Sequence, residues 1–181
     1  MQVHRNTAFR WRHRFLDRVK HDLPEQLNGI AETDEMFILE SQKGSRTLDR
    51  PARKRGGSAK RRGISRELDC ILVARDLDPQ VLLVTDANAA YRAFARDQGI
   101  AHRAVNLSAG VRVRRGAHGA FHVQNVNAYH RRLRDWLTPF HGVASRYLPN
   151  YLGWRRMLDG GKVTSADQLF RLAIGPIHSQ R

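Results

Sequence analysis

Two aspartates and one asparagine are the residues of this chain whose types and placement could support chemistry. Asp34 lies in a segment, residues 30–39, that carries apolar side chains at alternate positions, and Asp86 directly follows an apolar run at 81–85. Asn127 lies in a basic amphipathic segment further along. Carboxylate and amide oxygens are ligands that Mg²⁺ accepts, so these three side chains, if they meet, would form a pocket for a divalent cation.

Such a pocket beside nucleic acid would support phosphoryl transfer. Two divalent cations held close together activate a nucleophile and stabilise the leaving oxygen during an in-line displacement at phosphorus. Asn127 would be the weakest ligand, because its amide oxygen carries no charge. Each aspartate also has a simpler explanation. Asp34 could be solvated on an edge strand, and Asp86, at a strand-to-helix junction, could be a helix N-cap, the commonest role of Asp there.

The charge balance indicates a polyanionic partner. The chain has 181 residues, with 32 Lys and Arg against 17 Asp and Glu, and a formal net charge of +15. Nucleic acid is the usual partner of a protein with such an excess, and a generally basic composition is the alternative. The length favours one main domain with a small appendage.

Several classes of protein and site are disfavoured. Cys70 is the only cysteine and lies in an apolar run, so we expect a buried thiol and exclude a disulfide framework and a cysteine-based zinc site. His118 and His122 lack a matching Cys or helical frame for zinc. The chain begins with a polar, basic segment, and no apolar run approaches the ~18 residues of a membrane span. We therefore expect a cytoplasmic protein.

Alternation and short apolar runs predict the strands that position these residues. Alternation in 30–39 predicts a strand with Asp34 on the same face as Ile30, Met36 and Ile38. Further strands are expected at 70–74, 81–85, 100–105 and 111–115.

Apolar residues at helical spacing predict three helices. One is expected at 7–20, capped by Asn6 or Thr7, one at 87–98 and the strongest at 126–140. The side chains expected to point inward from the second helix are Ala90, Tyr91, Phe94 and Ala95. Residues 147–154 form another apolar, aromatic segment, and residues after 160 are expected to be a tail.

Two basic surfaces are candidates for contacts with nucleic acid. Residues 43–66 hold ten basic residues and one acid, with several glycines, and form either an arm that follows phosphates or a solvated insertion. Asn127, Arg131 and Arg134 recur along one face of the third helix, which could equally be an ordinary amphipathic helix. The arginine-rich helix at 7–20 either contacts DNA or is merely solvated. The candidate DNA-binding residues are Arg53, Lys54, Arg55, Lys60, Arg61, Arg62, Arg131 and Arg134.

Several short blocks of sequence together resemble one known family. The blocks are 31–35 (AETDE), 53–57 (RKRGG), 84–86 (VTD), 122–129 (HVQNVNAY), 140–144 (FHGVA) and 147–154 (YLPNYLGW). They resemble DDE-type insertion-sequence transposases with an ISXO-like catalytic domain, and the likeness runs from about Asn6 to Asp159.

The resemblance implies a fold and an activity. The fold would be α/β, an RNase H-like mixed sheet with flanking helices, and the activity Mg²⁺-dependent strand cleavage and transfer with two ions, for which Mn²⁺ can substitute. Asp34, Asp86 and Asn127 would be the catalytic and metal-binding triad, since some members use Asn as the third residue. The implied partner is double-stranded DNA of the insertion-sequence ends and target. A homo-oligomer associated with the bacterial nucleoid is expected.

The chain also departs from the family pattern. Arg134 stands where a Lys often follows the third catalytic residue, and the upstream zinc ribbon and helix-turn-helix are not present in full. The family places a strand and a helix between the strands at 70–74 and 81–85, and the link 77–80 is too short for a parallel crossover. Either the chain pairs these strands differently, or it carries an internal deletion, and we expect a truncated or decayed copy that lacks one strand and one helix.

The expected domain limits follow. Residues 1–28 would be the remnant helix and linker of a DNA-binding region, 29–159 the catalytic domain and 160–181 the tail. The first hypothesis is an insertion-sequence transposase, and the second is a non-catalytic DNA-binding remnant of one. A basic RNA-associated protein is the third, and it would not require Asp34, Asp86 and Asn127 to meet.

Overall fold

The chain folds into two compact units. The computed structural model describes residues 2–21, 29–54, 56–61, 64–72, 80–106, 109–110, 113–116, 119–161 and 165–174. Unit 1 comprises Met1–Leu23, Ser41–Ala52 and Phe140–Arg181, and unit 2 comprises Pro24–Glu40 and Arg53–Pro139. The domain limits expected from the sequence stay predictions.

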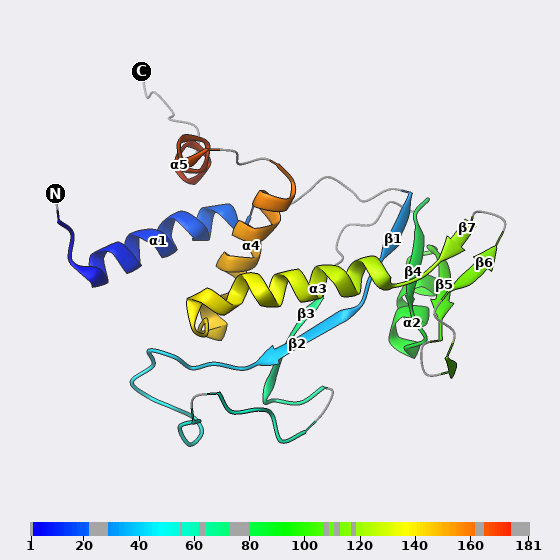
Figure 1. The fold of residues 1–181 in the computed structure, drawn as a ribbon, viewed down its shortest axis with the longest axis horizontal. Coiled ribbons are helices and arrows are strands. Elements are labelled where there is room, and N and C mark those ends of the chain that lie inside the picture. Colours follow the sequence, from blue (N-terminus) through cyan, green and yellow to red (C-terminus); the bar gives the residue numbers. More distant parts are fainter. Residues whose placement is uncertain are drawn as a thin grey trace. The chain divides into compact units, whose positions relative to one another are not determined.

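A three-stranded parallel sheet forms the centre of unit 2. Its strands are β1 (Ile30–Glu32), β4 (Leu82–Asp86) and β5 (Ala101–Val105), in the order β1-β4-β5 (Figure 1). Ile30 of β1 pairs with Leu82 of β4, and Leu82 pairs in turn with Ala101 of β5.

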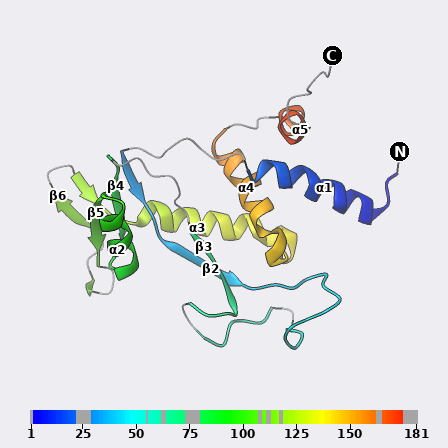
Figure 2. The same cartoon turned by 180° about the vertical axis from the view of Figure 1, so that it is seen from behind.

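Two antiparallel ladders complete the strands of unit 2. β2 (Glu35–Leu39) pairs with β3 (Leu68–Leu72), and β6 (Arg114–Gly116) forms a hairpin with β7 (Gly119–Phe121). β1 runs on into β2 with only Thr33 and Asp34 between them (Figure 2). One continuous extended segment therefore pairs first with β4 and then with β3.

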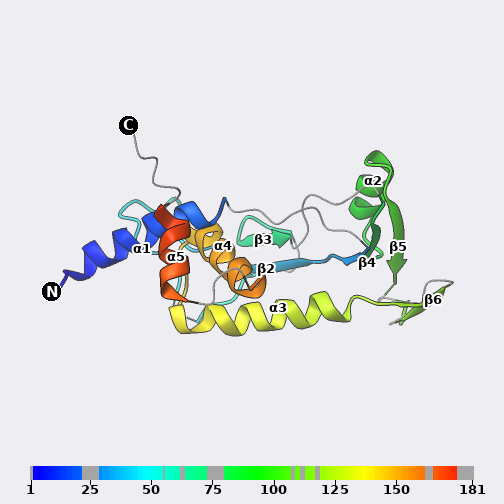
Figure 3. The ribbon, with the colours of Figure 1, turned by 90° about the horizontal axis from the view of Figure 1, so that it is seen from above.

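Helices cover both faces of the parallel sheet. α2 (Ala89–Asp97) packs Ala95 against Leu83, whereas α3 (Gln124–Leu137) packs Val126 against Val84. Leu83 and Val84 are neighbours on one strand and so point to opposite faces. α2 and α3 accordingly lie on opposite sides of the strands (Figure 3). The expectation of a mixed α/β fold with flanking helices is confirmed at this level.

Unit 1 is built from helices. α1 (Arg5–Val19) packs against α4 (Leu148–Asp159) and α5 (Ala166–Ile174), and a short 3₁₀ helix, η3 (Ser145–Tyr147), precedes α4. Another 3₁₀ helix, η2 (Thr138–Phe140), contains the point at which the chain passes from unit 2 to unit 1. Close approach requires Gly153, because a Cβ there would lie 2.5 Å from the Cα of Lys20. We did not expect α5, which lies in the segment interpreted as a tail.

The strand expected at 30–39 is divided. Ala31 and Thr33 are buried before the division and Met36 after it, so the buried side changes from odd to even residues. Ile30 is 56% exposed, and its assignment to a common inner face with Met36 was wrong. The cause is the exchange of partners between Glu32 and Glu35, from β4 to β3.

Other details of the sequence interpretation were also wrong. Cys70 is exposed, because β3 turns Ile71 inward and Cys70 outward. Phe94 and Ala90 are exposed, since α2 buries only Tyr91 and Ala95.

Helix α1 also begins earlier than expected. It starts at Arg5, and the ring of His4 caps it by accepting the N–H of Asn6, so neither Asn6 nor Thr7 is the cap.

The premise of a parallel crossover after β3 was wrong as well. β3 runs antiparallel to β2, while β4 runs parallel to β1, which continues into β2. β3 and β4 thus run in opposite directions, and a connection between antiparallel strands can be short. Residues 73–79, which include most of the expected link 77–80, lie outside the described residues. The loss of one strand and one helix stays a prediction.

Candidate functional site

Strand pairing in unit 2 brings Asp34 and Asp86 to equivalent positions. Glu32 pairs with Val84, and the N–H of Thr33 continues this parallel ladder by donating to the carbonyl of Val84 at 2.9 Å. Asp34 lies two residues after Glu32 on one strand, and Asp86 lies two residues after Val84 on the other. Both aspartates therefore lie at the carboxyl ends of β1 and β4, near enough for the charge of Asp86 to act on Asp34.

The electrostatics of Asp34 reflect this neighbour. Partial burial raises the pKa of Asp34 above its ordinary value, the hydrogen bond from the N–H of Glu35 opposes this, and the negative charges of Asp86 and Glu35 raise the pKa further. A carboxylate that is partly desolvated beside another carboxylate is stabilised by a cation. The pair is therefore suited to a positively charged ligand.

Asp86 is not the helix cap that its position suggested. The N-cap of α2 is Asn88, whose side chain accepts the N–H of Ala90 at 3.0 Å. Asp86 accepts the N–H of Asn88 at 2.9 Å through Oδ1, just as Asp34 accepts that of Glu35 at 2.9 Å. In each aspartate the other oxygen accepts no hydrogen bond from the described residues. These two oxygens remain available to a ligand.

Glu32 joins the strand of Asp34 to the helix of Asn127. Its carboxylate accepts the backbone N–H groups of Asn125 (2.9 Å) and Val126 (3.2 Å) and the side-chain amide of Asn125 (2.6 Å), and lies 3.3 Å from Nδ1 of His122. The N-cap residue of α3 supplies no side-chain hydrogen bond, so this acid from β1 satisfies the first N–H groups of the helix.

The Glu32 contact also determines which side of the sheet α3 occupies. Glu32 pairs with Val84, so the two side chains point to the same face of the sheet. Val84 packs against Val126. Asn127 follows Val126 in the first turn of α3 and is exposed. Asn127 thus lies on the helix that covers the Val84 face of the sheet.

Tyr91 is a neighbour of the aspartates that the sequence did not reveal. It is only 7% exposed, and its hydroxyl has no hydrogen-bond partner among the described residues. Burial raises its pKa, and the negative charges of Glu35, Asp34 and Asp86 add to that effect. The phenol of α2 thus lies close to the acidic end of the sheet.

The candidate DNA-binding residues differ in exposure and in the contacts that they already form. Arg131 and Arg134 are exposed on α3, on the same helix as Asn127. In the arm, Lys54, Lys60 and Arg61 are exposed. Arg53 donates to the carbonyl of Glu40 at 2.6 Å and lies 3.7 Å from its carboxylate, so it holds the end of β2. Arg55 and Arg62 lie outside the described residues.

The described residues contain no group of three or more His, Cys, Asp and Glu side chains able to hold a metal ion. The candidate site thus offers two carboxylates and one amide. His122 is engaged with Glu32, and His118 lies outside the described residues. No helix in the described part of the chain has the length and apolar character needed to span a membrane.

One comparison with known proteins bears on this site. The model of the ISXO2-like transposase domain matches residues 62–155, just over half of the chain, including Asp86 and Asn127. No curated protein and no solved structure matches the chain.

Proposed function

Because the chain belongs to the ISXO2-like transposase domain family, we propose that it is a DNA transposase of an insertion sequence with Asp34, Asp86 and Asn127 as its catalytic centre. The observation that supports the assignment is the pairing of β1 with β4, since Asp34 follows β1, Asp86 ends β4, and the charge of Asp86 acts on Asp34. Asp34 lies outside the matched residues, and its place in the centre rests on this pairing.

The residues fit a divalent cation. Asp34 and Asp86 each offer one oxygen without a hydrogen bond from the described residues, and their like charges lie side by side. Together with the amide oxygen of Asn127, these oxygens would hold Mg²⁺, with Mn²⁺ as a substitute. Bound there, a pair of such ions would supply activation of the nucleophile and neutralise charge on the leaving oxygen.

The remaining roles fall to residues of α3 and β1. Arg134 lies seven residues after Asn127, about two helical turns or roughly 10 Å along the axis, where its planar guanidinium can contact a phosphate with two hydrogen bonds. Arg131 lies between them. Glu32 is a positioning residue, because it fixes the start of the helix that carries all three.

A non-catalytic DNA-binding remnant is the second candidate. Leu72 at the end of β3 and Phe94 of α2 are exposed apolar side chains in unit 2, as expected if covering elements have been lost. In this view the basic surfaces persist and turnover is absent. Under either candidate we propose double-stranded DNA as partner and nucleoid association, and a homo-oligomer for an active enzyme.

A strand-cleavage assay separates the two candidates. The purified chain is incubated with the terminal DNA of its element and Mg²⁺ or Mn²⁺, beside Asp34→Ala and, as a control, Asp97→Ala at the end of α2. A transposase cleaves DNA, loses cleavage in Asp34→Ala without losing DNA binding, and keeps it in Asp97→Ala. An inert chain that binds DNA supports the remnant, and cleavage by Asp34→Ala rejects the assigned site.

A further inference from the structure

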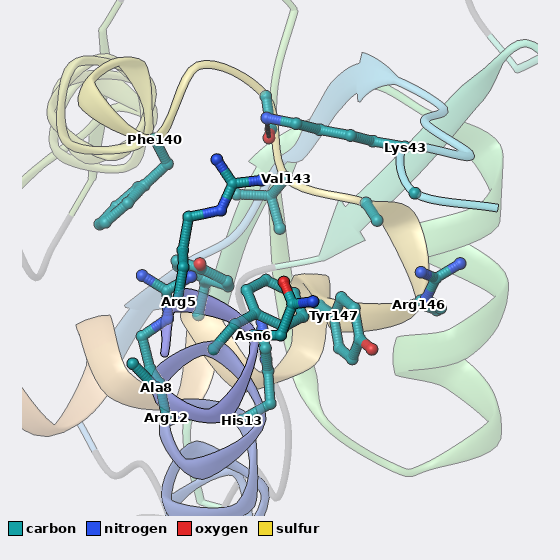
Figure 4. Close-up of a pocket in the computed structure, with 15 residues that line it drawn as sticks. Arg5, Asn6, Ala8, Arg12, His13, Lys43, Phe140, Val143, Arg146 and Tyr147 are labelled. Atoms are coloured by element: carbon teal, nitrogen blue, oxygen red, sulfur yellow. Dashed lines mark hydrogen bonds between the residues drawn. The ribbon is translucent and has the colours of Figure 1, made fainter. Parts of the chain in front are cut away.

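Unit 1 contains a pocket that the proposed catalytic centre does not use. Its volume is about 840 Å³, and its described lining belongs to unit 1 alone. The first two turns of α1 face residues 140–147 across it (Figure 4). This size is in the range of pockets that hold small organic groups. We call it the α1 pocket.

The α1 pocket is cationic. Arg5, Arg12, Lys43 and Arg146 line it, and its described lining contains no aspartate or glutamate. Lys43 donates to the carbonyls of His141 and Gly142 at 3.0 Å, so it holds the loop as well as adding charge. The three arginines form no ion pair within the described part of the chain. These charges favour an anionic occupant.

The amino end of α1 strengthens this preference. The helix has no acidic residue in its first turn, so its positive dipole end is not neutralised there. His13 in the pocket wall is only 7% exposed, and its Nε2 has no hydrogen-bond partner in the described residues. Burial, followed by the charges of Arg12 and Arg146, lowers the pKa of His13. The arginine charges therefore act on the interior of the pocket.

Aromatic side chains also line the pocket, and one of them, Phe9, is partly exposed. Tyr147 stacks on His13 at 3.8 Å between ring centroids, with the guanidinium of Arg146 4.9 Å from its ring, and Tyr151 is buried. Phe9 is 40% exposed, and Arg12 lies 5.4 Å from its ring. An anion that also carries a flat apolar ring would satisfy both features of the pocket.

We propose that the α1 pocket binds one unstacked nucleotide of single-stranded DNA, with its phosphate against Arg5, Arg12 and Arg146 and its base against Phe9. Cationic grooves with aromatic platforms are how proteins hold single strands without reading sequence. Duplex DNA presents its phosphates on a convex surface and keeps its bases stacked, so it cannot fill a concave aromatic pocket. The proposal rests on the proposed function only in taking DNA as the ligand.

Binding is measured by fluorescence anisotropy with the full chain carrying Asp34→Ala, so that the probe is not cut. The probes are a labelled oligothymidylate of roughly 12 nucleotides, within the usual site size, and a labelled hairpin duplex. The variants are Phe9→Ala and Arg146→Ala. Trp11→Ala and Arg10→Ala are matched controls, because both residues are exposed on α1 and neither lines the pocket.

Phe9→Ala should weaken single-strand binding about tenfold, the loss expected for one base–aromatic stack, and leave duplex binding within about twofold. Arg146→Ala should weaken single-strand binding and lower its salt slope by about 0.7. Trp11→Ala should have no effect, and Arg10→Ala should weaken both probes alike. Circular dichroism verifies folding, and if Phe9→Ala unfolds, Arg5→Ala carries the same test, because Arg5 is exposed and unpaired in the described part of the chain.

Equal effects of Phe9→Ala and Trp11→Ala, or equal effects on both probes, would overturn the proposal. So would binding of free thymidine monophosphate as tight as that of the oligomer, or much tighter binding of single-stranded RNA. Single-strand binding that does not depend on Phe9, with duplex binding intact, rejects the α1 pocket and leaves the transposase assignment standing. If single-strand binding depends on the α1 pocket but the chain cleaves no DNA, only the transposase assignment is rejected.

Discussion

The acidic end of the parallel sheet in unit 2 and the α1 pocket in unit 1 are opposites in charge. The first sets Asp34 beside Asp86, with Glu35 adding negative charge, while the second gathers four cations without a carboxylate in its described lining. Each concentration of like charge costs folding free energy unless an oppositely charged ligand binds. Our two proposals would thus assign a cation and a polyanion to different regions of a chain with net charge +15.

The two sites also differ in how the backbone builds them. The acidic site arises where two paired strands end, with Asp34 two residues after β1 and Asp86 the last residue of β4. The α1 pocket arises from a helix face and loop residues, held by contacts such as that of Lys43 with the carbonyls of His141 and Gly142. Sites on strands hold ligands in fixed geometry, which metal-dependent chemistry needs, whereas a pocket lined by long arginines suits a flexible strand of DNA.

The largest expected effect is a complete separation of cleavage from binding. Asp86→Ala should abolish strand cleavage, because it removes one of two carboxylates from the cation site, while single-strand binding by the α1 pocket stays within about twofold of wild type. Gel assays of cleavage and anisotropy of binding on the same preparation measure both. Loss of both properties together would show that the two sites are not independent.

Glu32 should give the next largest effect, on stability and cleavage together. Glu32→Ala removes the acceptor of three hydrogen bonds at the start of α3, and we expect a loss of about 2 kcal/mol in the free energy of unfolding. Glu32→Gln keeps an oxygen acceptor and should lose less than half as much. Denaturant titration followed by circular dichroism measures both variants. A cleavage rate unchanged in a destabilised Glu32→Ala would limit Glu32 to a purely structural role.

Sequence patterns predict only part of the arrangement of these sites. Asp34 and Asp86 could be selected because each lies on or at the end of a recognisable strand segment. The contact of Glu32 with the start of α3 could not be predicted, because Glu32 bonds to a residue 93 positions away. The exchange of partner strands within 30–39 could not be predicted for the same reason, since the alternation of apolar residues does not indicate which strand pairs with the segment.

Local sequence patterns also fail to predict the α1 pocket and the exposure of Cys70. The pocket draws on α1, on residues 43–44 and on residues 140–151, which no local pattern connects. The apolar run around Cys70 resembled a strand covered on both faces, yet only Ile71 in β3 is buried. Hydrophobic runs predict strands well, but burial depends on which layers cover them.

A smaller effect should appear in the metal-free stability of unit 2. The folded pKa of Asp34 lies above its ordinary value of 3.8, so its charge destabilises the folded chain at neutral pH. As the pH falls through the folded pKa, the native state takes up a proton first and this penalty is relieved. Asp34→Asn in EDTA should therefore have a higher Tm than wild type at neutral pH, and the difference should vanish below 3.8.

Thermal melts across this pH range, with Asp97→Asn as the control at an exposed site, test the sign of the effect. Added Mg²⁺ should raise the Tm of wild type and not that of Asp34→Asn, because ligand binding to the folded state stabilises it. If Asp34→Asn melts below wild type at neutral pH, the Asp34 carboxylate stabilises the fold by itself.

The smallest effect concerns residues 53–66, the part of the basic arm that belongs to unit 2 and contributes neither to the proposed cation site nor to the α1 pocket. Lys54, Lys60 and Arg61 are exposed, so each can contact a phosphate of duplex DNA. Replacing all three by Ala should flatten the plot of log affinity against log salt by about 0.9 for each phosphate that is no longer neutralised, and weaken binding to all sequences alike.

Arg53→Ala is the informative comparison, because Arg53 already donates to the carbonyl of Glu40 and pairs with its carboxylate. It should lower stability and leave the salt slope nearly unchanged. Duplex binding between low and moderate salt measures both slopes. A slope that responds to Arg53 and not to the other three would mean that the arm changes its contacts when DNA binds.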